Sequence, residues 1–228
     1  MFAALEPAMV ARRLAGSRTL EDYLIARHHA LDEMLGDVIE RRGVTQVLEL
    51  AAGLSPRGWR FSRDYGDSLV YLETDLAPMV RRKRAALERI GVRPAGHRVT
   101  ELDALRESGP ASLSAIVSDL DPHRGLAVVS EGLLSYLPDS EVTKLWGRLA
   151  RALRSFSGGH YLFDLGVGRA MTDRASRAFR YALAAFVRGP VHEHFPDDET
   201  AVRACAGRAL TRSRSSAPTA RSRPAHLA

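Results

Sequence analysis

Hydrophobic residues follow two different spacings along this chain, and the two alternate. Short continuous apolar runs predict buried strands, and stretches with an apolar residue every three or four positions predict amphipathic helices. The predicted strands span residues 47–50, 69–73, 97–102, 126–131 and 160–165. The predicted helices span residues 19–42, 78–90, 110–120, 139–153, 169–187 and 196–206, and a further helix begins at Ser55 and Pro56. Strands that alternate with helices in this way predict an α/β fold with a doubly wound, mostly parallel sheet.

The first predicted strand runs directly into a turn of small residues. Val47-Leu48-Glu49-Leu50 is followed by Ala51-Ala52-Gly53, and Ser55 and Pro56 then have the residue types of a helix cap and a first helical position. In an open parallel sheet, such a turn lies at the carboxyl end of the strand, where ligands bind, and a glycine lets a ligand approach the backbone. Turns of this composition also serve packing alone, so the turn is a candidate binding site only if other parts of the chain agree.

The composition favours one domain in a reducing compartment. The chain has 228 residues, of which 45% are hydrophobic and 26% charged, which is enough for one substantial core. The single cysteine, Cys205, excludes an intramolecular disulfide and a multi-cysteine metal site. No secretory signal follows Met1, and no apolar run approaches the length of a membrane span. We therefore expect a cytoplasmic protein with no metal site and no membrane span.

The net charge of +6 is concentrated near the end of the chain. Residues 206–228 contain five arginines and no acidic residue, which leaves about +1 for everything before them. Because residues 207–228 show no apolar periodicity, we predict a disordered basic tail there. Such a tail can bind nucleic acid or an acidic membrane through charge alone, which is one alternative function. Nucleic-acid binding by the rest of the chain is not expected.

Acidic residues lie within or after several of the predicted strands. Glu49 is within the first strand, Glu73 and Asp75 are at the end of the second, Asp103 follows the third, and Glu131 ends the fourth. Since parallel strands end at one edge of the sheet, these carboxylates are expected to converge there. A carboxylate after the second strand can accept hydrogen bonds from both ribose hydroxyls, and the next can meet the amino group of adenine. Each acid taken alone has a plain alternative as a cap or surface group, preferred for Glu49, but together they favour a nucleoside cofactor.

Three segments match the motifs of one known family in the same order. A first motif similar to E-L-G-A-G-L-D-x-R is matched by Glu49-Leu50-Ala51-Ala52-Gly53-Leu54-Ser55-Pro56-Arg57. A second, Y-x-E-x-D-x-P, is matched by Tyr71-Leu72-Glu73-Thr74-Asp75-Leu76-Ala77-Pro78, with the proline one place later, and a third, E-G-L-L-x-Y-L, is matched in full by Glu131-Gly132-Leu133-Leu134-Ser135-Tyr136-Leu137. The chain thus resembles the S-adenosylmethionine-dependent methyltransferases of the leucine carboxyl methyltransferase family, including its bacterial polyketide O-methyltransferase branch.

The resemblance implies a Rossmann-like class I methyltransferase fold, S-adenosyl-L-methionine as cofactor, and O-methylation of a carboxylate or hydroxyl of a small molecule. It implies that Gly53 lies under the methionine part and Asp75 holds the ribose. Asp103 with Ala104 would read the adenine, Glu131 would contact the ammonium, and an arginine before the first strand, here Arg27, would bind the carboxylate. The cofactor-binding residues expected in this way are Arg27, Glu49, Ala51, Gly53, Asp75, Asp103, Ala104 and Glu131.

The resemblance also divides the chain and exposes three departures. Residues 1–43 are expected to form an amino-terminal helical cap, residues 44–206 the cofactor-binding methyltransferase domain, and residues 207–228 the tail.

Ala51 replaces the family's first glycine, which is harmless only if its φ is negative, and Ser55 replaces an aspartate. The family's sheet finishes with an antiparallel pair, whereas this chain ends in the unpatterned tail. We expect the sheet to lack these strands and to present an exposed edge prone to pairing or aggregation.

The methyl acceptor determines whether catalysis needs a base. A carboxylate needs none, whereas a phenol or alcohol needs a base such as His192 or His194. The two histidines could instead belong to a surface loop, and Tyr136 could line the acceptor pocket or pack beneath it. A protein that binds the cofactor without turnover is the remaining alternative. The sequence leaves open the acceptor and the oligomeric state.

Overall fold

One parallel sheet organises the described part of the chain. The computed structural model describes residues 20–91 and 94–165, and the separate positions 192, 194, 195, 199, 200 and 203. The strands, in the spatial order β3-β2-β1-β4-β5, are all parallel. They are β1 (Val44–Leu50), β2 (Val70–Asp75), β3 (His97–Glu101), β4 (Gly125–Ser130) and β5 (Gly159–Phe163). The predicted doubly wound α/β fold is confirmed.

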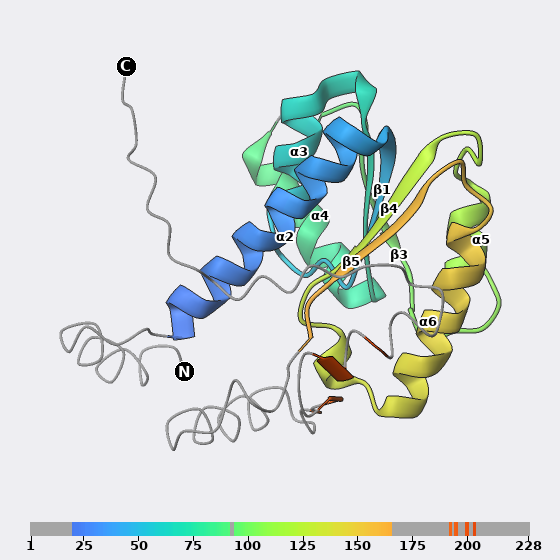
Figure 1. The fold of residues 1–228 in the computed structure, drawn as a ribbon. Coiled ribbons are helices and arrows are strands. Elements are labelled where there is room, and N and C mark those ends of the chain that lie inside the picture. Colours follow the sequence, from blue (N-terminus) through green and yellow to red (C-terminus); the bar gives the residue numbers. More distant parts are fainter. Residues whose placement is uncertain are drawn as a thin grey trace.

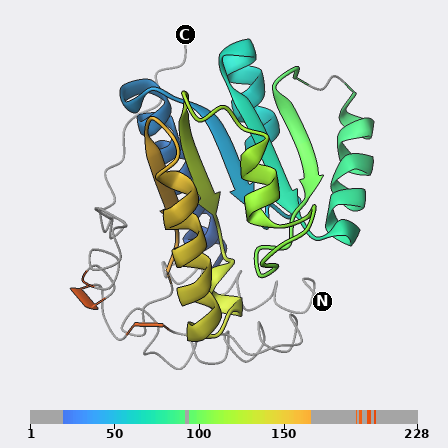
Figure 2. The same ribbon diagram turned by 90° about the vertical axis from the view of Figure 1, so that its right-hand side faces the viewer.

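Helices cover both faces of this sheet (Figures 1 and 2). On one face lie α2 (Leu20–Arg42), α3 (Arg57–Tyr65) and α4 (Ala77–Ile90). On the other lie α5 (Leu113–Ser118) and α6 (Asp139–Leu153), and the short 3-10 helices η1 (Gly66–Ser68) and η2 (Leu134–Tyr136) occupy connections. Each layer buries its own apolar cluster, so the sheet is covered on both sides and its central strands are hydrophobic along their length.

Alternation along β1 explains how one strand serves both layers. Leu48 and Leu50 pack in the cluster that contains Trp146 of α6, while Val47 packs in the cluster that contains Leu35 of α2. Successive side chains of a strand point to opposite faces, so Glu49 shares the face of Val47. An acidic residue is therefore directed into the buried layer between β1 and α2, where it needs a partner.

The observed element boundaries differ from the predicted ones by a few residues. The helix predicted over residues 110–120 is shorter, Leu113–Ser118. The helix predicted from Ser55 and Pro56 begins at Arg57, with Pro56 as its N-cap residue. Ser55 Oγ accepts a hydrogen bond from the backbone nitrogen of Arg57 at 3.2 Å, two residues on, so the serine closes a local turn and the helix starts after it.

Several predicted segments lie outside the described residues. These are the first 19 residues, the helix over 169–187, most of the helix over 196–206, and the tail over 207–228. Positions 199, 200 and 203 are helical, in agreement with the second of these helices. Within the described ranges, no helix has the length and apolarity required to cross a bilayer.

The turn after β1 holds an alanine in a strained conformation. Ala51 has a φ of 51° and Gly53 a φ of 54°, both in the left-handed region. That region is free for glycine, but costs an alanine about 1–2 kcal/mol. The turn is held by hydrogen bonds from the backbone nitrogen of Ala52 to Thr74 O (3.0 Å) and from that of Ser55 to Ala52 O (3.1 Å). Because the φ of Ala51 is positive, an alanine in place of the family's glycine costs conformational free energy.

We predict that Ala51→Gly stabilises the protein by about 0.5–1 kcal/mol, because relief of strain exceeds the greater entropy that glycine brings to the unfolded chain. Urea unfolding measures this difference. Ala52→Gly is the matched control, since Ala52 is buried and its φ is not positive, and it should lower stability. An Ala51→Gly variant no more stable than the original would contradict the prediction.

Candidate functional site

A cleft of about 520 Å³ lies at the carboxyl edge of the sheet, above the end of β1. Its walls come from α2, from the turn between β1 and α3, and from the residue after β4. The structure brings five of the predicted cofactor-binding residues together in its lining: Arg27, Glu49, Ala51, Gly53 and Glu131. Residues more than 100 positions apart in the sequence thus meet in one place, as expected at the strand ends of an α/β sheet.

A fully buried arginine, Arg57, joins the elements around this cleft. Its Nε donates to Asp32 of α2 at 2.5 Å, and its Nη1 donates to Glu49 of β1 at 2.7 Å. Its Nη2 donates to Glu131, just after β4, at 2.6 Å. Glu49 also accepts from the hydroxyl of Tyr71 at 2.7 Å. A buried guanidinium is tolerated only with such a full set of partners, so the three carboxylates are what allow Arg57 to be inside.

The carboxylates of this cluster differ in their titration. Burial raises the pKa of Asp32 and of Glu131, but hydrogen bonds from Arg57 and its neighbours outweigh it, and both pKa values lie below the ordinary range. Burial also raises the pKa of Glu49, and there it outweighs the attraction of Arg57. Burial raises the pKa of Asp164 in the same way. Burial lowers the pKa of Arg57, but Glu49 and the other acidic partners raise it above its usual value, so it stays charged.

Arg27 and Glu131, predicted to bind opposite ends of one amino-acid group, are paired with each other. Arg27 Nε lies 3.1 Å from Glu131 Oε1, and Arg27 Nη1 lies 3.1 Å from Asp164 Oδ2. Asp164 also accepts from the backbone nitrogen of Gly132 at 2.6 Å. Sequence reasoning missed Asp164, although it follows the fifth strand as the other acids follow theirs.

Asp75 supports the turn that carries Gly53. Its Oδ2 accepts from the backbone nitrogen of Gly53 and its Oδ1 from that of Leu76, each at 2.8 Å. Asp103 accepts from the backbone nitrogen of Leu105 at 3.0 Å, and the carbonyl of Ala104 accepts from Arg148 of α6 at 2.7 Å. Asp103 and Ala104 follow β3, the strand next to β2, but do not line the cleft of about 520 Å³.

A second buried ion cluster lies under the same turn and was also missed. Glu73 of β2 is completely buried and lies 2.6 Å from Lys83 Nζ of α4 and 2.8 Å from His97 Nε2 of β3. Lys83 Nζ also donates to the carbonyl of Ser55 at 2.7 Å. The available signal was a lysine on the apolar stripe of α4, between Val80 and Leu87, where a buried ammonium needs acceptors.

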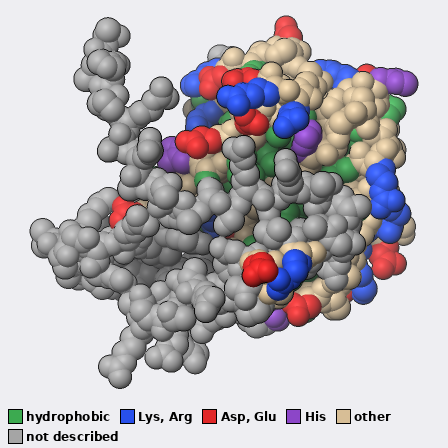
Figure 3. Space-filling model, in the orientation of Figure 1, with side chains coloured by type: hydrophobic (Ala, Val, Ile, Leu, Met, Phe, Trp, Pro, Cys, Tyr) green, Lys and Arg blue, Asp and Glu red, His purple; other side chains and the backbone are tan. Residues whose placement is uncertain are grey.

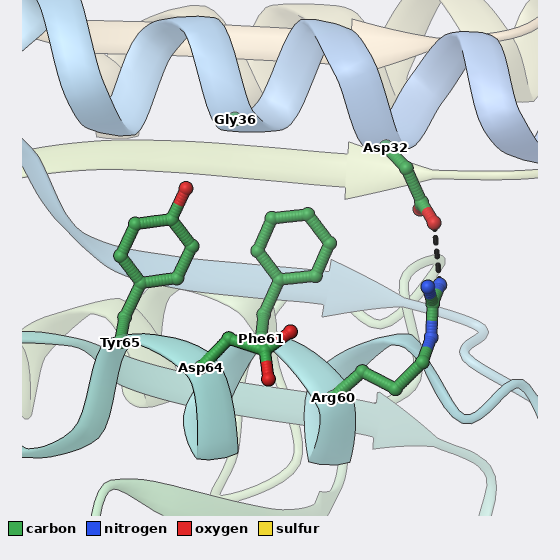
Figure 4. Close-up of a pocket in the computed structure, with 6 residues that line it drawn as sticks. All are labelled: Asp32, Gly36, Arg60, Phe61, Asp64 and Tyr65. Atoms are coloured by element: carbon green, nitrogen blue, oxygen red, sulfur yellow. Dashed lines mark hydrogen bonds and ion pairs between the residues drawn. The ribbon is translucent and has the colours of Figure 1, made fainter. Parts of the chain in front are cut away.

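A smaller cavity of about 280 Å³ lies between α2 and α3. In Figure 4, Phe61 and Tyr65 of α3 point toward Gly36 of α2, and the pair of Asp32 and Arg60 stands beside them. The two rings are stacked, with centroids 5.9 Å apart. Because Asp32 also binds Arg57, this cavity adjoins the buried cluster.

The residues predicted for catalysis lie around η2. Tyr136 is 40% exposed. The backbone nitrogen of His192 donates to Ser135 O at 2.8 Å, and His194 places Nδ1 2.6 Å from Asp139 Oδ1 and Nε2 2.8 Å from Leu134 O. Each ring nitrogen of His194 thus has an oxygen of the chain beside it, so the ring would have to leave a partner before it could accept a proton from a substrate. A catalytic role for Tyr136, His192 or His194 stays a prediction.

The described residues offer no metal centre, and on one face of the molecule their charges are mixed. Among the described positions, no group of three His, Cys, Asp or Glu side chains is placed to hold a metal ion. On the face shown in Figure 3, acidic and basic side chains lie side by side. The basic tail on which the alternative of binding through charge depends is outside the described residues.

Replacing Arg57 by methionine should lower the free energy of unfolding by about 3–5 kcal/mol, because it leaves Glu49 buried without its cation. Urea unfolding followed by circular dichroism measures the loss. Arg63→Met is the control, since Arg63 is exposed and pairs with the exposed Asp64, and it should cost less than about 1 kcal/mol. Equal losses in the two variants would show that the ion pairs of Arg57 do not stabilise this edge of the sheet.

Replacing Glu131 by glutamine should remove stability that depends on pH. The pKa of Glu131 is held below its usual 4.5, so its carboxylate contributes stability that is fully present above that pH and is lost as the pH falls through the lowered pKa. The difference in unfolding free energy between the original chain and Glu131→Gln should be largest near pH 7 and shrink below about pH 4. Asp64→Asn serves as an exposed control, and a Glu131→Gln difference constant with pH would contradict this account.

Comparison with known proteins identifies the family to which this chain belongs. The family model for leucine carboxyl methyltransferase matches residues 2–150. A protein from Mycobacteroides abscessus, provisionally named an S-adenosyl-L-methionine-dependent methyltransferase, is 33% identical over 144 residues, which are 63% of this chain and 43% of that protein. A Mycobacterium avium protein of the same name is 36% identical over 125 residues, 55% of this chain and 38% of that protein. The chain thus spans less than half the length of these curated relatives.

A solved structure supports the fold. A protein from Nostoc punctiforme, provisionally titled an O-methyltransferase, superposes with a TM-score of 0.60 at 15% identity, over 87% of this chain and 54% of that one. At this identity the likeness shows the fold alone. This superposition agrees with the Rossmann-like strand order of the sheet, β3-β2-β1-β4-β5.

Proposed function

Because the chain belongs to the leucine carboxyl methyltransferase family, we propose that it binds S-adenosyl-L-methionine in the cleft above β1 and transfers the methyl group to an oxygen of a small molecule. The observation that carries the proposal is the convergence of Arg27, Glu131 and the Gly53 turn in one cleft at the carboxyl edge of the sheet. The names of the curated relatives support the same cofactor.

The charges around the cleft suit the amino-acid end of this cofactor. That end carries one ammonium and one carboxylate, and the cleft offers an anion, Glu131, beside a cation, Arg27. Exchange of their direct ion pair for two pairs with the ligand leaves the charge balance unchanged. A side chain added at Gly53 would meet no atom within 4 Å, so the space above the turn is open to a ligand.

Asp75 suits the ribose. Each carboxylate oxygen accepts one backbone hydrogen bond, from Gly53 or Leu76, and each retains a second lone pair for a hydroxyl. The backbone bonds fix the orientation of the carboxylate before any ligand arrives, which reduces the entropy lost on binding. Asp103 and Ala104 remain the proposed contacts of the adenine, since they follow the neighbouring strand.

The cofactor supplies an electrophilic methyl group on sulfur, and the residues of this chain would position that group and the acceptor. Arg27 and Glu131 would hold the amino-acid end and Asp75 the ribose, so that an acceptor oxygen can align with the methyl carbon. The engagement of both ring nitrogens of His194 supports an acceptor that needs no base, that is, a carboxylate. A hydroxyl acceptor would require His194 to leave its partners, or another base.

Calorimetry with S-adenosylhomocysteine tests the cofactor site. We expect the chain to bind it and Asp75→Asn to weaken binding about tenfold or more, because the amide turns an N–H toward the turn and loses charge-assisted bonds to the ribose. Asp67→Asn is the control, since Asp67 lies in η1, exposed and before β2, and it should bind like the original. No heat with the original chain would reject the proposal, and binding without transfer of a labelled methyl group would favour the alternative without turnover.

A further inference from the structure

The cation under the Gly53 turn is a lysine in a chain that otherwise uses arginine. Only two of its 33 basic residues are lysines, Lys83 and Lys144. Lys144 lies on the exposed side of α6, whereas the side chain of Lys83 is 6% exposed. A buried lysine loses its hydration and is retained only where its ammonium has a set of acceptors.

The acceptors of Lys83 belong to two different parts of the molecule. One is Glu73 Oε1, at 2.6 Å, in the central sheet. The other is the backbone carbonyl of Ser55, at 2.7 Å, in the turn that follows Gly53. Lys83 therefore links the turn to a carboxylate whose place is set by the sheet.

Glu73 is held firmly enough to act as an anchor. It is completely buried, its Oε2 lies 2.8 Å from His97 Nε2, and its Oε1 accepts from the backbone nitrogen of Gly58 at 3.2 Å. A Cβ added at Gly58 would lie 2.5 Å from Glu73 Cγ, so the first turn of α3 rests directly on this side chain. The carboxylate thus contacts α3, α4 and β3 at once.

The turn needs such an external hold because its own geometry is unfavourable. Ala51 has a φ of 51°, which alanine adopts at a cost of about 1–2 kcal/mol, and the helix that follows begins without a side-chain cap. Contacts from outside must therefore keep the turn in place. Lys83 provides such a contact at the carbonyl of Ser55, while the space beside Gly53 in the same turn stays open to a ligand.

We propose that Lys83 is a positioning residue for the cofactor: its ammonium, anchored on Glu73, holds the Ser55 carbonyl and thereby keeps the 51–55 turn in the conformation that binds the ligand. The inference rests on the proposed function, since the ligand is the one assigned there. In this proposal Lys83 both neutralises the charge of Glu73 and holds the 51–55 turn. Mutation can separate these two roles.

A double variant separates them. Lys83→Met leaves Glu73 without its lysine and is expected to destabilise the fold, so its binding alone decides nothing. In Lys83→Met combined with Glu73→Gln, the carboxylate that the single variant leaves without its lysine is removed as well, and the glutamine oxygen can still accept from Gly58. We expect the double variant to recover the thermal midpoint of the original chain to a large extent, but to bind S-adenosylhomocysteine about tenfold or more weakly by calorimetry.

Lys144→Met is the matched control, since it removes the other lysine from an exposed pair, and it should leave both the thermal midpoint and the affinity unchanged. A folded double variant that binds as tightly as the original chain overturns the role of Lys83 and leaves the proposed function standing. Failure of the original chain to bind overturns both.

A measurement on the unaltered chain tests the proposal even if the double variant does not fold. Labelling of lysine with carbon-13 gives signals from two side chains only. Saturation with S-adenosylhomocysteine should shift the Cε signal of Lys83 and leave that of Lys144 in place, because only Lys83 contacts the turn. Binding that leaves both signals unmoved overturns the proposal.

Discussion

The buried guanidinium of Arg57 is the interaction on which the carboxyl edge of the sheet depends. It receives one carboxylate from α2, one from β1 and one from the segment after β4. Without it, acids that are now paired would repel one another inside the protein. The planar fork of a guanidinium can reach three separate partners, which the compact ammonium of a lysine could not do at the same distances. Charge pairing therefore holds this edge together above a core that is closed by apolar packing.

Polar contacts from β2 and α4 hold the turn between β1 and α3. The carbonyl of Thr74 and the carboxylate of Asp75 secure it to β2, and Lys83 secures it from α4. These contacts outweigh the strain at Ala51, whose cost of about 1–2 kcal/mol is comparable to one or two hydrogen bonds. A strained turn kept in place by its surroundings is a common feature of binding sites, because the ligand then meets a conformation already formed.

The charged groups around Arg27 suit the zwitterionic amino-acid end of the proposed cofactor. Arg27 shares Glu131 with Arg57, and Asp164 completes the group from the end of β5. A ligand with one positive and one negative group can enter such a set without leaving a buried charge unpaired. Under the proposed function, a ligand group of a single charge would disturb the pairs, so the cluster would favour the zwitterionic end.

The sequence by itself determined the order of the elements and the edge at which function is sought. Apolar runs located the strands, and acids after Val70-Tyr71-Leu72 and after Val128-Val129-Ser130 marked the carboxyl ends, because these patterns depend only on local spacing. Glu73 and Lys83 were visible as residues, but their pairing was not, since it follows from how α4 packs on β2. The sign of φ at Ala51 and the placement of Arg27 against Glu131 were likewise decided only in the folded chain. Contacts between residues distant in sequence depend on tertiary packing, which no local pattern records.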